Sequence, residues 1–161
     1  MPGFDCVALL RSLAQNEVEF IVVGGVAEVL QGVPSITRGL DVFYRRDAAN
    51  IQRTISAMHG LDARFHVGPH LAPNPSQLHP GPNLLATEFG PLEIRDTIGR
   101  ALSYEDLISQ TDEMEVGEFR IRVLQLEKLI ALKQELGREQ DLAMLPTLRS
   151  TLAEKRRLNL K

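Results

Sequence analysis

The sequence predicts an α/β (α+β) fold in which helices flank a mixed β-sheet. Short apolar runs rich in β-branched residues alternate with stretches whose apolar residues recur at helical spacing. The 161 residues are 43% hydrophobic and 24% charged, which suits one domain with a sizeable core. We therefore expect a single domain over residues 1–161 that ends in a C-terminal helical segment over residues 126–152.

The first half of the chain contains three helical patterns and three strand patterns. The run that ends at Val23 is too apolar for a surface strand and predicts a buried one, which Gly24 terminates. Asp47 is a suitable N-cap for the third helix, and Gly60 ends it. The expected helices cover residues 4–15, 26–31 and 48–60, and the expected strands cover residues 18–23, 40–44 and 63–66.

The second half opens with a change in composition. Residues 68–82 contain five prolines and predict a long loop that we expect to be mobile. Ser103 and Asp106 have the spacing of a capping box and predict a short helix. Strands are expected at residues 84–89 and 92–94, around a turn at Gly90-Pro91, and at 119–123. Helices are expected from 126 to 137 and around 142–148, followed by a polar tail at 155–157.

Composition excludes several classes of function. The net charge of −3 gives no overall electrostatic case for DNA or other nucleic-acid binding. Cys6 is the only cysteine, so an intrachain disulfide and a thiolate zinc site are excluded. The N-terminus lacks the basic and apolar pattern of a signal peptide, and no apolar run approaches the roughly 20 residues that span a bilayer. We expect a cytoplasmic protein without a membrane partner.

The glycine pair Gly24-Gly25 is the first candidate binding element. Glycine lets a ligand approach the backbone closely, and the N-terminus of the following helix offers unpaired N–H groups to an anion. The pattern is neither a Walker loop nor a Rossmann fingerprint. The alternative interpretation is a tight strand-to-helix turn that binds nothing.

Two carboxylates inside apolar strands form the second candidate site. Asp41 lies between Leu40 and Val42, and Glu93 occupies the middle of the run Leu92-Glu93-Ile94. A carboxylate in such a position is costly unless it is paired or binds a metal. Mg²⁺ is usually held by one or two carboxylates together with substrate phosphates. Alternatively, Asp41 faces solvent or pairs with Arg38.

Charged residues near the C-terminus allow both a structural and a binding role. Lys133 and Arg138 lie near the end of an expected helix, where cations suit the helix dipole, and Asp141 can cap the next helix. Phosphate or partner binding is the alternative. His66 and His70 have i, i+4 spacing, but the intervening Gly68-Pro69 disfavours the helix that would make them a zinc site.

Taken together, these features resemble the nucleotidyltransferase superfamily, which has the DNA polymerase β-like fold. More narrowly, they resemble small bacterial members related to the minimal nucleotidyltransferases and the abortive-infection-type toxins. The resemblance covers most of the chain. It is carried by residues 20–44, with the glycine pair and the acid strand, by residues 90–94, and by the helical motif over residues 123–141.

The resemblance implies transfer of a nucleoside monophosphate from an NTP such as ATP to a protein or RNA acceptor, with Mg²⁺ as cofactor. Family members hold two metal ions with three acids. Asp41 and Glu93 match two of these acids and would be catalytic and metal-binding residues. The nucleotide-binding residues implied by the resemblance are Gly24, Gly25, Thr37, Arg38, Lys133 and Arg138.

Gly39 departs from the family pattern. It stands where the first acid of the pair is expected; if the register slid by two residues, Phe43 would replace the second acid instead. Either way, one of three metal ligands is absent. Two hypotheses therefore stay open: an active nucleotidyltransferase, or a degenerate member that binds a nucleotide or a partner, as in a toxin–antitoxin pair. A structural or dimerisation domain is a third, favoured if Asp41 and Glu93 point to different faces.

Overall fold

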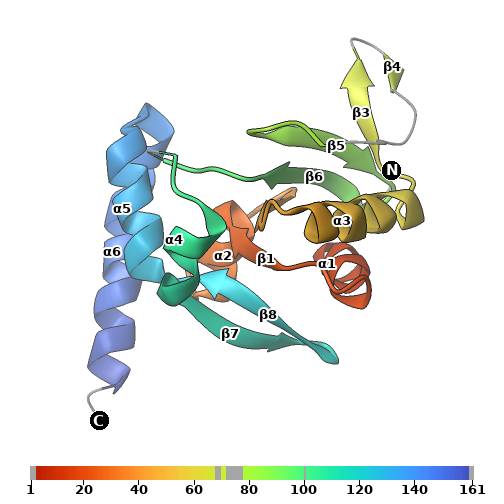
Figure 1. Cartoon of the computed structure of the whole chain (residues 1–161). Helices are drawn as coiled ribbons and strands as arrows, with labels where there is room; N and C mark the ends of the chain where they lie inside the picture. Colours follow the sequence, from red (N-terminus) through yellow and green to blue (C-terminus); the bar gives the residue numbers. More distant parts are fainter. Residues whose placement is uncertain (1–2, 68–69, 72–77, 100, 160–161) are drawn as a thin grey trace.

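A mixed β-sheet forms the centre of the molecule (Figure 1). The computed structural model describes residues 3–67, 70–71, 78–99 and 101–159, with the backbone alone for 66–67 and 70–71. The strands are β1 Phe20–Val23, β2 Leu40–Tyr44, β3 Arg64–Val67, β4 His70–Leu71, β5 Asn83–Thr87, β6 Gly90–Arg95, β7 Thr111–Val116 and β8 Phe119–Leu124. Within these ranges the sheet has eight strands in the order β4-β3-β5-β6-β2-β1-β8-β7.

Helices are distributed over both halves of the chain. They are α1 Cys6–Gln15, α2 Gly24–Leu30, α3 Ala48–Gly60, α4 Tyr104–Leu107, the 3₁₀ helix η1 Ile108–Gln110, α5 Leu126–Leu136 and α6 Glu139–Asn159. As predicted, Asp47 caps α3 by accepting from the Asn50 N–H, and Ser103 with Asp106 forms a capping box. None of the helices in the described ranges has both the length and the apolarity to cross a membrane.

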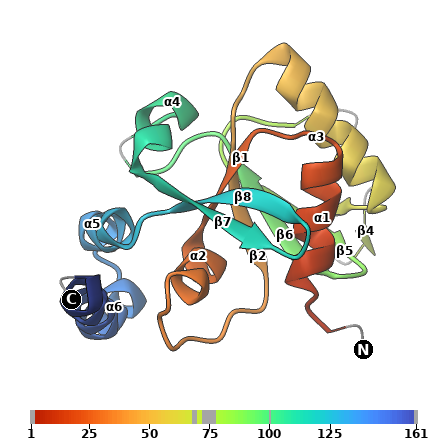
Figure 2. The same cartoon turned by 90° about the horizontal axis from the view of Figure 1, so that it is seen from below.

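Part of the core lies between the sheet and the helices α1 and α3, which pack together against one of its faces (Figure 2). Leu9 and Leu13 of α1 and Met58 of α3 are fully buried there. Buried residues of α2, α5 and α6 belong to the same core.

Along β6, the buried Leu92 and Ile94 alternate with the half-buried Glu93 and Arg95, because successive side chains of a strand point to opposite sides. The opposite face, which we call the open face, is accessible at Asp41 of β2, whereas Phe43 on the same face is fully buried. The open face is the one that carries Asp41 and Glu93.

Strand register places one row of residues across the middle of the sheet. Val23 pairs with Asp41, Asp41 pairs with Glu93, and Glu93 pairs with Leu84. Neighbouring strands lie about 4.8 Å apart, so these side chains are immediate neighbours. Val23 is followed by Gly24, so the row also brings the glycine pair beside the acids.

The structure confirms the predicted fold class and most element positions, with four differences. The turn between β5 and β6 lies at Glu88-Phe89, and Gly90-Pro91 belongs to β6. The strand β7 was not predicted. The helix α2 begins at Gly24 itself, and α6 continues to Asn159, so the expected polar tail is helical. Lys155 of that helix donates to Gln31 Oε1 at 2.5 Å, a contact that anchors it.

Most of the predicted loop at 68–82 lies outside the described residues. Within it, the backbone of β4 pairs antiparallel with β3. Leu78 is buried, and the ring of His79 lies 5.8 Å from that of Phe65. The side chains of His66 and His70 lie outside the described set, so the expectation that they do not form a zinc site stays a prediction.

Candidate functional site

Asp41 and Glu93 lie side by side on the open face of the sheet. They are register partners on the parallel strands β2 and β6. Burial, the negative charge of Glu93 and a hydrogen bond with Glu93 raise the pKa of the Asp41 carboxyl to about 7. The arrangement thus concentrates negative charge that lacks full compensation, which is the electrostatic condition for binding a cation. We expected a purely structural domain only if Asp41 and Glu93 pointed to different faces. Their side-by-side position gives that hypothesis no support.

Arg95 is a third charged residue at this position, and sequence reasoning missed it. Its guanidinium forms an ion pair with Glu93 Oε1 and partly offsets the charge on Asp41. Arg95 follows Glu93 by two residues on β6, and the period of two in a strand was the signal that could have placed both on one face. Glu93 thus contacts both Arg95, through Oε1, and Asp41.

Gly24 makes room for the Asp41 carboxylate. Its φ is +66°, a left-handed conformation, and a Cβ at this position would overlap Asp41 Oδ2. Gly25 is tight for a different reason, because its Cβ would lie 2.9 Å from Thr37 Oγ1. The glycine pair therefore lets the first turn of α2 and the loop before β2 close around the acid strand.

Thr37 and Arg38 lie apart from the acids. The Thr37 hydroxyl donates to the Gly39 carbonyl at 3.0 Å, which shapes the loop before β2. Arg38 is exposed, and the charge partners of Asp41 are Glu93 and Arg95. Neither Thr37 nor Arg38 lines the two cavities that adjoin the acid pair, so their predicted contact with nucleotide stays a prediction.

Charged side chains from α5, from α6 and from Arg138 between them face the acid pair across a cavity. Lys133 Nζ lies 2.9 Å from Glu28 Oε1 and 3.7 Å from Asp141 Oδ1, and the Glu28 contact is an ion pair without hydrogen-bond geometry. Arg138 donates twice to Asp141, from Nε at 2.6 Å and from Nη2 at 3.2 Å. These hydrogen bonds, together with the nearby positive charges, lower the pKa of the Asp141 carboxyl. Glu28 is only 4% exposed and was not predicted to take part.

This cavity, of about 230 Å³, separates the acid pair from these charged side chains. Gly24 and Val23 lie on the sheet side, and Leu132 and Leu136 contribute apolar surface on the helix side. Its ionisable lining residues are Glu28, Asp41, Glu93 and Asp141 against Arg95, Lys133 and Arg138. Four carboxylates against three cations leave a formal charge of −1 when all are ionised.

The residues present fit one divalent cation and do not fit two. Asp41 and Glu93 give the one or two carboxylates with which Mg²⁺ is usually held beside substrate phosphates. In the part of the chain that the structure describes, no group of three or more His, Cys, Asp or Glu side chains could hold a metal. A two-ion clamp needs the third acid that Gly39 lacks.

The surroundings of Gly39 are filled by Pro91. A Cβ at position 39 would lie 3.2 Å from both the Cβ and the carbonyl oxygen of Pro91. Phe43 points to the same face as Asp41 by strand alternation, and Gly39, just before β2, lines one cavity together with Asp41; neither residue brings a carboxylate. The missing acid is therefore accompanied by a close approach of β6 to that position.

Comparisons with known proteins place the fold. No protein-family model and no curated protein sequence matches the chain. The structure is similar to that of TM1012 from Thermotoga maritima, a nucleotidyltransferase candidate, with 21% identity, 92% of each chain covered and a TM-score of 0.55. It is also similar to the lincosamide antibiotic adenylyltransferase LnuA in its lincomycin-bound form, with 17% identity, 89% of this chain and 94% of that chain covered, and a TM-score of 0.62. The chain therefore has a nucleotidyltransferase-like fold.

Proposed function

We propose that the protein binds a nucleoside triphosphate with one divalent cation and transfers its nucleoside monophosphate to an acceptor. The observation that carries the proposal is the Asp41–Glu93 pair beside Gly24, in a cavity whose other wall presents Lys133 and Arg138. The nucleotidyltransferase-like fold is consistent with this kind of reaction. ATP as donor, Mg²⁺ as the cation and a protein or RNA as acceptor are the specific expectations from the sequence.

Charge explains why a cation is needed. The cavity has a formal charge of −1, and a triphosphate adds several negative charges. Lys133 and Arg138 are already paired with Glu28 and Asp141, so they cannot neutralise the phosphates alone. A divalent ion on Asp41 and Glu93 would neutralise charge on the transferring phosphate. We therefore expect nucleotide binding to depend on a divalent cation.

The residues have distinct tasks in this proposal. Asp41 and Glu93 hold the cation, and Gly24 keeps backbone and acid close enough for the triphosphate to meet both. Lys133 of α5 lines the opposite wall of the cavity and would supply positive charge to the phosphates. An acceptor oxygen bonds to the α-phosphorus, pyrophosphate leaves with the electron pair of the broken bond, and the carboxylate pair takes up the acceptor proton.

A second candidate function is binding without turnover. Gly39 and its nearness to Pro91 favour it, because the missing acid lowers the capacity of the site for metal and a side chain at position 39 would be crowded by Pro91. In this version the nucleotide, or a protein partner as in a toxin–antitoxin pair, occupies the site without transfer. Loss of a metal ligand costs rate steeply, since each 1.36 kcal/mol of transition-state stabilisation is worth tenfold.

Calorimetric titration with ATP tests the shared part of both candidates. We expect binding in the presence of Mg²⁺, none in EDTA, and a loss of roughly tenfold or more in affinity for Asp41→Asn because one cation ligand becomes neutral. Asp62→Asn is the matched control, since Asp62 is exposed and forms a surface ion pair with the nearby Arg64. Equal ATP binding in Mg²⁺ and EDTA would contradict the proposal.

Pyrophosphate release separates the two candidates. Protein that binds Mg·ATP is incubated with α-phosphate-labelled ATP and, in separate reactions, total cellular RNA, total cellular protein and a cellular small-molecule extract. Labelled acceptor together with released pyrophosphate supports transfer. Binding without either product favours the non-catalytic candidate.

A further inference from the structure

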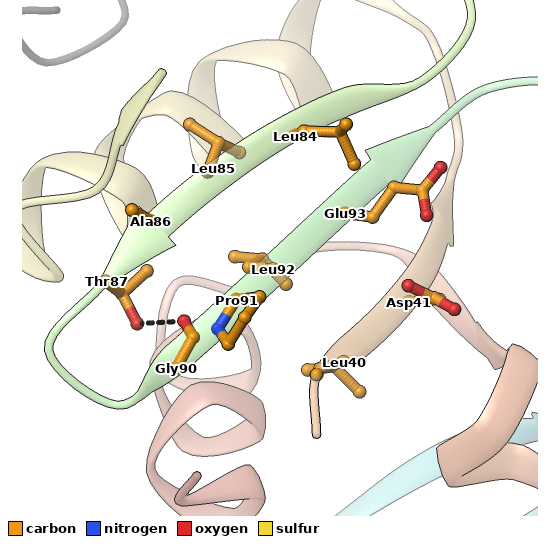
Figure 3. Close-up of a pocket in the computed structure, with 11 residues that line it drawn as sticks. Leu40, Asp41, Leu84, Leu85, Ala86, Thr87, Gly90, Pro91, Leu92 and Glu93 are labelled. Carbon is orange, nitrogen blue, oxygen red and sulfur yellow. Dashed lines mark hydrogen bonds between the residues drawn. The ribbon is translucent and has the colours of Figure 1, made fainter. Parts of the chain in front are cut away.

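A second cavity begins at the acid pair and runs away from the charged helices. It extends along β2, β6 and β5 on the open face of the sheet and ends near Thr87 and Gly90 (Figure 3). Its volume is about 430 Å³, within the range of small-molecule sites. We call it the sheet groove. Asp41 and Glu93 line both cavities, so a molecule in the groove lies next to whatever the acids bind.

The walls of the sheet groove are apolar. Leu84 is 63% exposed there, and it is the direct register partner of Glu93. Ala86 and Pro91 form the next row, also as register partners. Large exposed apolar side chains beside a carboxylate pair are costly to solvate, which favours an apolar ligand surface over them.

The groove carries negative charge alone. Among its described lining residues, Asp41 and Glu93 are the only ionisable ones, and no Lys or Arg is present. Arg95, two residues after Glu93 on β6, lines the other cavity. A nucleic-acid strand needs Lys or Arg to neutralise its phosphates, so this lining opposes an RNA backbone and complements a neutral or cationic molecule.

Gly39 belongs to this groove. It lies in the wall beside Pro91, in the cavity that Asp41 also lines. An acid at this position would bring a third carboxylate to the apolar wall. The glycine at position 39 therefore accounts both for the absence of the third metal ligand and for part of the uncharged wall of the groove.

We propose that the sheet groove is the acceptor site and that it takes a small hydroxyl-bearing molecule with an apolar body and a neutral or positive charge. The assignment rests on the proposed function for its chemistry. The acceptor hydroxyl lies against the acid pair, its oxygen bonds to the α-phosphorus, pyrophosphate leaves with the electron pair, and the hydroxyl proton passes to the carboxylates. An RNA acceptor, one of the two expected from the sequence, is disfavoured by the absence of Lys and Arg from the described lining.

Three probes with one six-carbon tail test the groove without nucleotide or metal. Hexylammonium, 1-hexanol and hexanoate are titrated at pH 8 in EDTA, and binding is followed by the NMR shifts of leucine methyl groups. We expect hexylammonium to bind about fivefold more tightly than 1-hexanol and about thirtyfold more tightly than hexanoate, because one charge interaction at about 4 Å in water attracts the cation and repels the anion. The Leu84 methyls are expected to shift most. Equal binding of the cation and the anion would overturn the proposal.

Two leucine variants localise the effect. Leu84→Ser is expected to weaken hexylammonium and hexanol about threefold through lost apolar contact. Leu142→Ser is the matched control, because Leu142 is 50% exposed on α6 and lines neither cavity. Unchanged affinity in Leu84→Ser would refute the assignment, as would binding of a fluorescent twelve-residue oligoadenylate that shifts the Leu84 methyls.

The outcomes distinguish this inference from the proposed function. Mg·ATP binding without probe binding would leave the proposed function standing and remove the acceptor assignment. Probe binding without Mg·ATP binding would leave an apolar ligand site and remove the transfer reaction.

Discussion

Two glycines flank the acid strand, and the structure uses them in opposite ways. Gly24 has a left-handed backbone, and its missing side chain leaves the space that the Asp41 carboxylate occupies. Gly39 has no such backbone requirement, and the space above it is taken by Pro91 of the neighbouring strand. The first glycine is required by the geometry of the site, whereas the second marks a place where an acid is conformationally allowed but crowded.

A glycine can therefore make space for a ligand residue, as Gly24 does for Asp41, or stand where a ligand residue is expected, as Gly39 does. At Gly24 a side chain is excluded by Asp41 itself, so the turn and the acid depend on each other. At Gly39 the neighbour is an adjacent strand, which can shift by a few tenths of an ångström. Substitutions at the two positions should therefore differ in size and in kind.

Gly24→Ala is expected to have the largest effect. The new Cβ would overlap Asp41 Oδ2 and would also force alanine into a left-handed conformation. We expect a loss of about 3 kcal/mol in the free energy of unfolding, from backbone strain and overpacking together. Thermal denaturation should show a fall in Tm of roughly 6–12 °C, and Mg·ATP binding should be lost.

Gly60→Ala is the control for this substitution. A Cβ there meets nothing within 4 Å, and the residue ends α3 without a left-handed backbone. We expect unchanged or slightly higher stability, since alanine favours helix by up to about 1 kcal/mol. A Gly24→Ala protein as stable as wild type would show that Asp41 moves freely and that the two residues are not coupled.

Gly39→Asp is expected to cost less stability than Gly24→Ala and to strengthen metal binding rather than weaken it. A third carboxylate beside Asp41 should raise the affinity for Mn²⁺, used as a paramagnetic probe, by about tenfold, because each charged ligand strengthens an oxygen-ligand site. The contact with Pro91 should cost about 1 kcal/mol of stability. Electron paramagnetic resonance titration of free Mn²⁺ gives the affinity, and urea denaturation gives the stability.

The uncharged isostere Gly39→Asn isolates the carboxylate. It meets the same crowding from Pro91 and so should lose the same stability, but it should leave Mn²⁺ affinity near that of wild type. If Asp and Asn change the affinity equally, position 39 does not face the acid pair. Combining Gly39→Asp with Pro91→Ala should recover part of the lost stability, since it removes the ring contact and leaves the carbonyl contact.

Sequence reasoning succeeded where a residue conflicts with its local surroundings. A carboxylate in an apolar strand is such a conflict, and it located Asp41 and Glu93 on two strands that prove to be neighbours. Capping signals were also local, which is why Asp47 and Ser103 were assigned correctly. Strand β7 was missed because its acidic residues alternate along an edge strand and present no apolar run.

The partners of the site residues could not be predicted, because they depend on tertiary packing. Glu28 and Lys133 are more than a hundred residues apart in sequence, and their ion pair exists only because α2 and α5 pack together. Pro91 was expected in a turn, since proline is unfavourable inside a sheet. Its place in β6 beside Gly39 follows from the pairing of strands, which no local pattern reports.

Asp41→Asn is expected to change the stability of the metal-free protein by a small amount that depends on pH. In metal-free buffer the pKa of the Asp41 carboxyl is raised to about 7 by burial and by Glu93, whereas an unfolded chain titrates near ~3.9. The folded protein therefore holds more protons between about pH 4 and pH 7, so this group lowers stability as pH rises through that window. Because Asp41 is partly exposed and solvent screens its charge, the asparagine variant should gain only about 1 kcal/mol at pH 8.

Urea denaturation at pH 5 and pH 8 in EDTA measures this gain, with Asp62→Asn as the matched control. The advantage of Asp41→Asn should shrink at pH 5, where the wild-type carboxyl is mostly protonated in the folded state. Adding Mg²⁺ at pH 8 should stabilise the wild type and leave the variant unchanged, because only the wild type offers two carboxylates. A variant less stable than wild type at pH 8 would mean that Arg95 compensates Asp41 fully. The crowded acid pair would then be a structural ion cluster, and Gly24 would serve packing rather than a cation site.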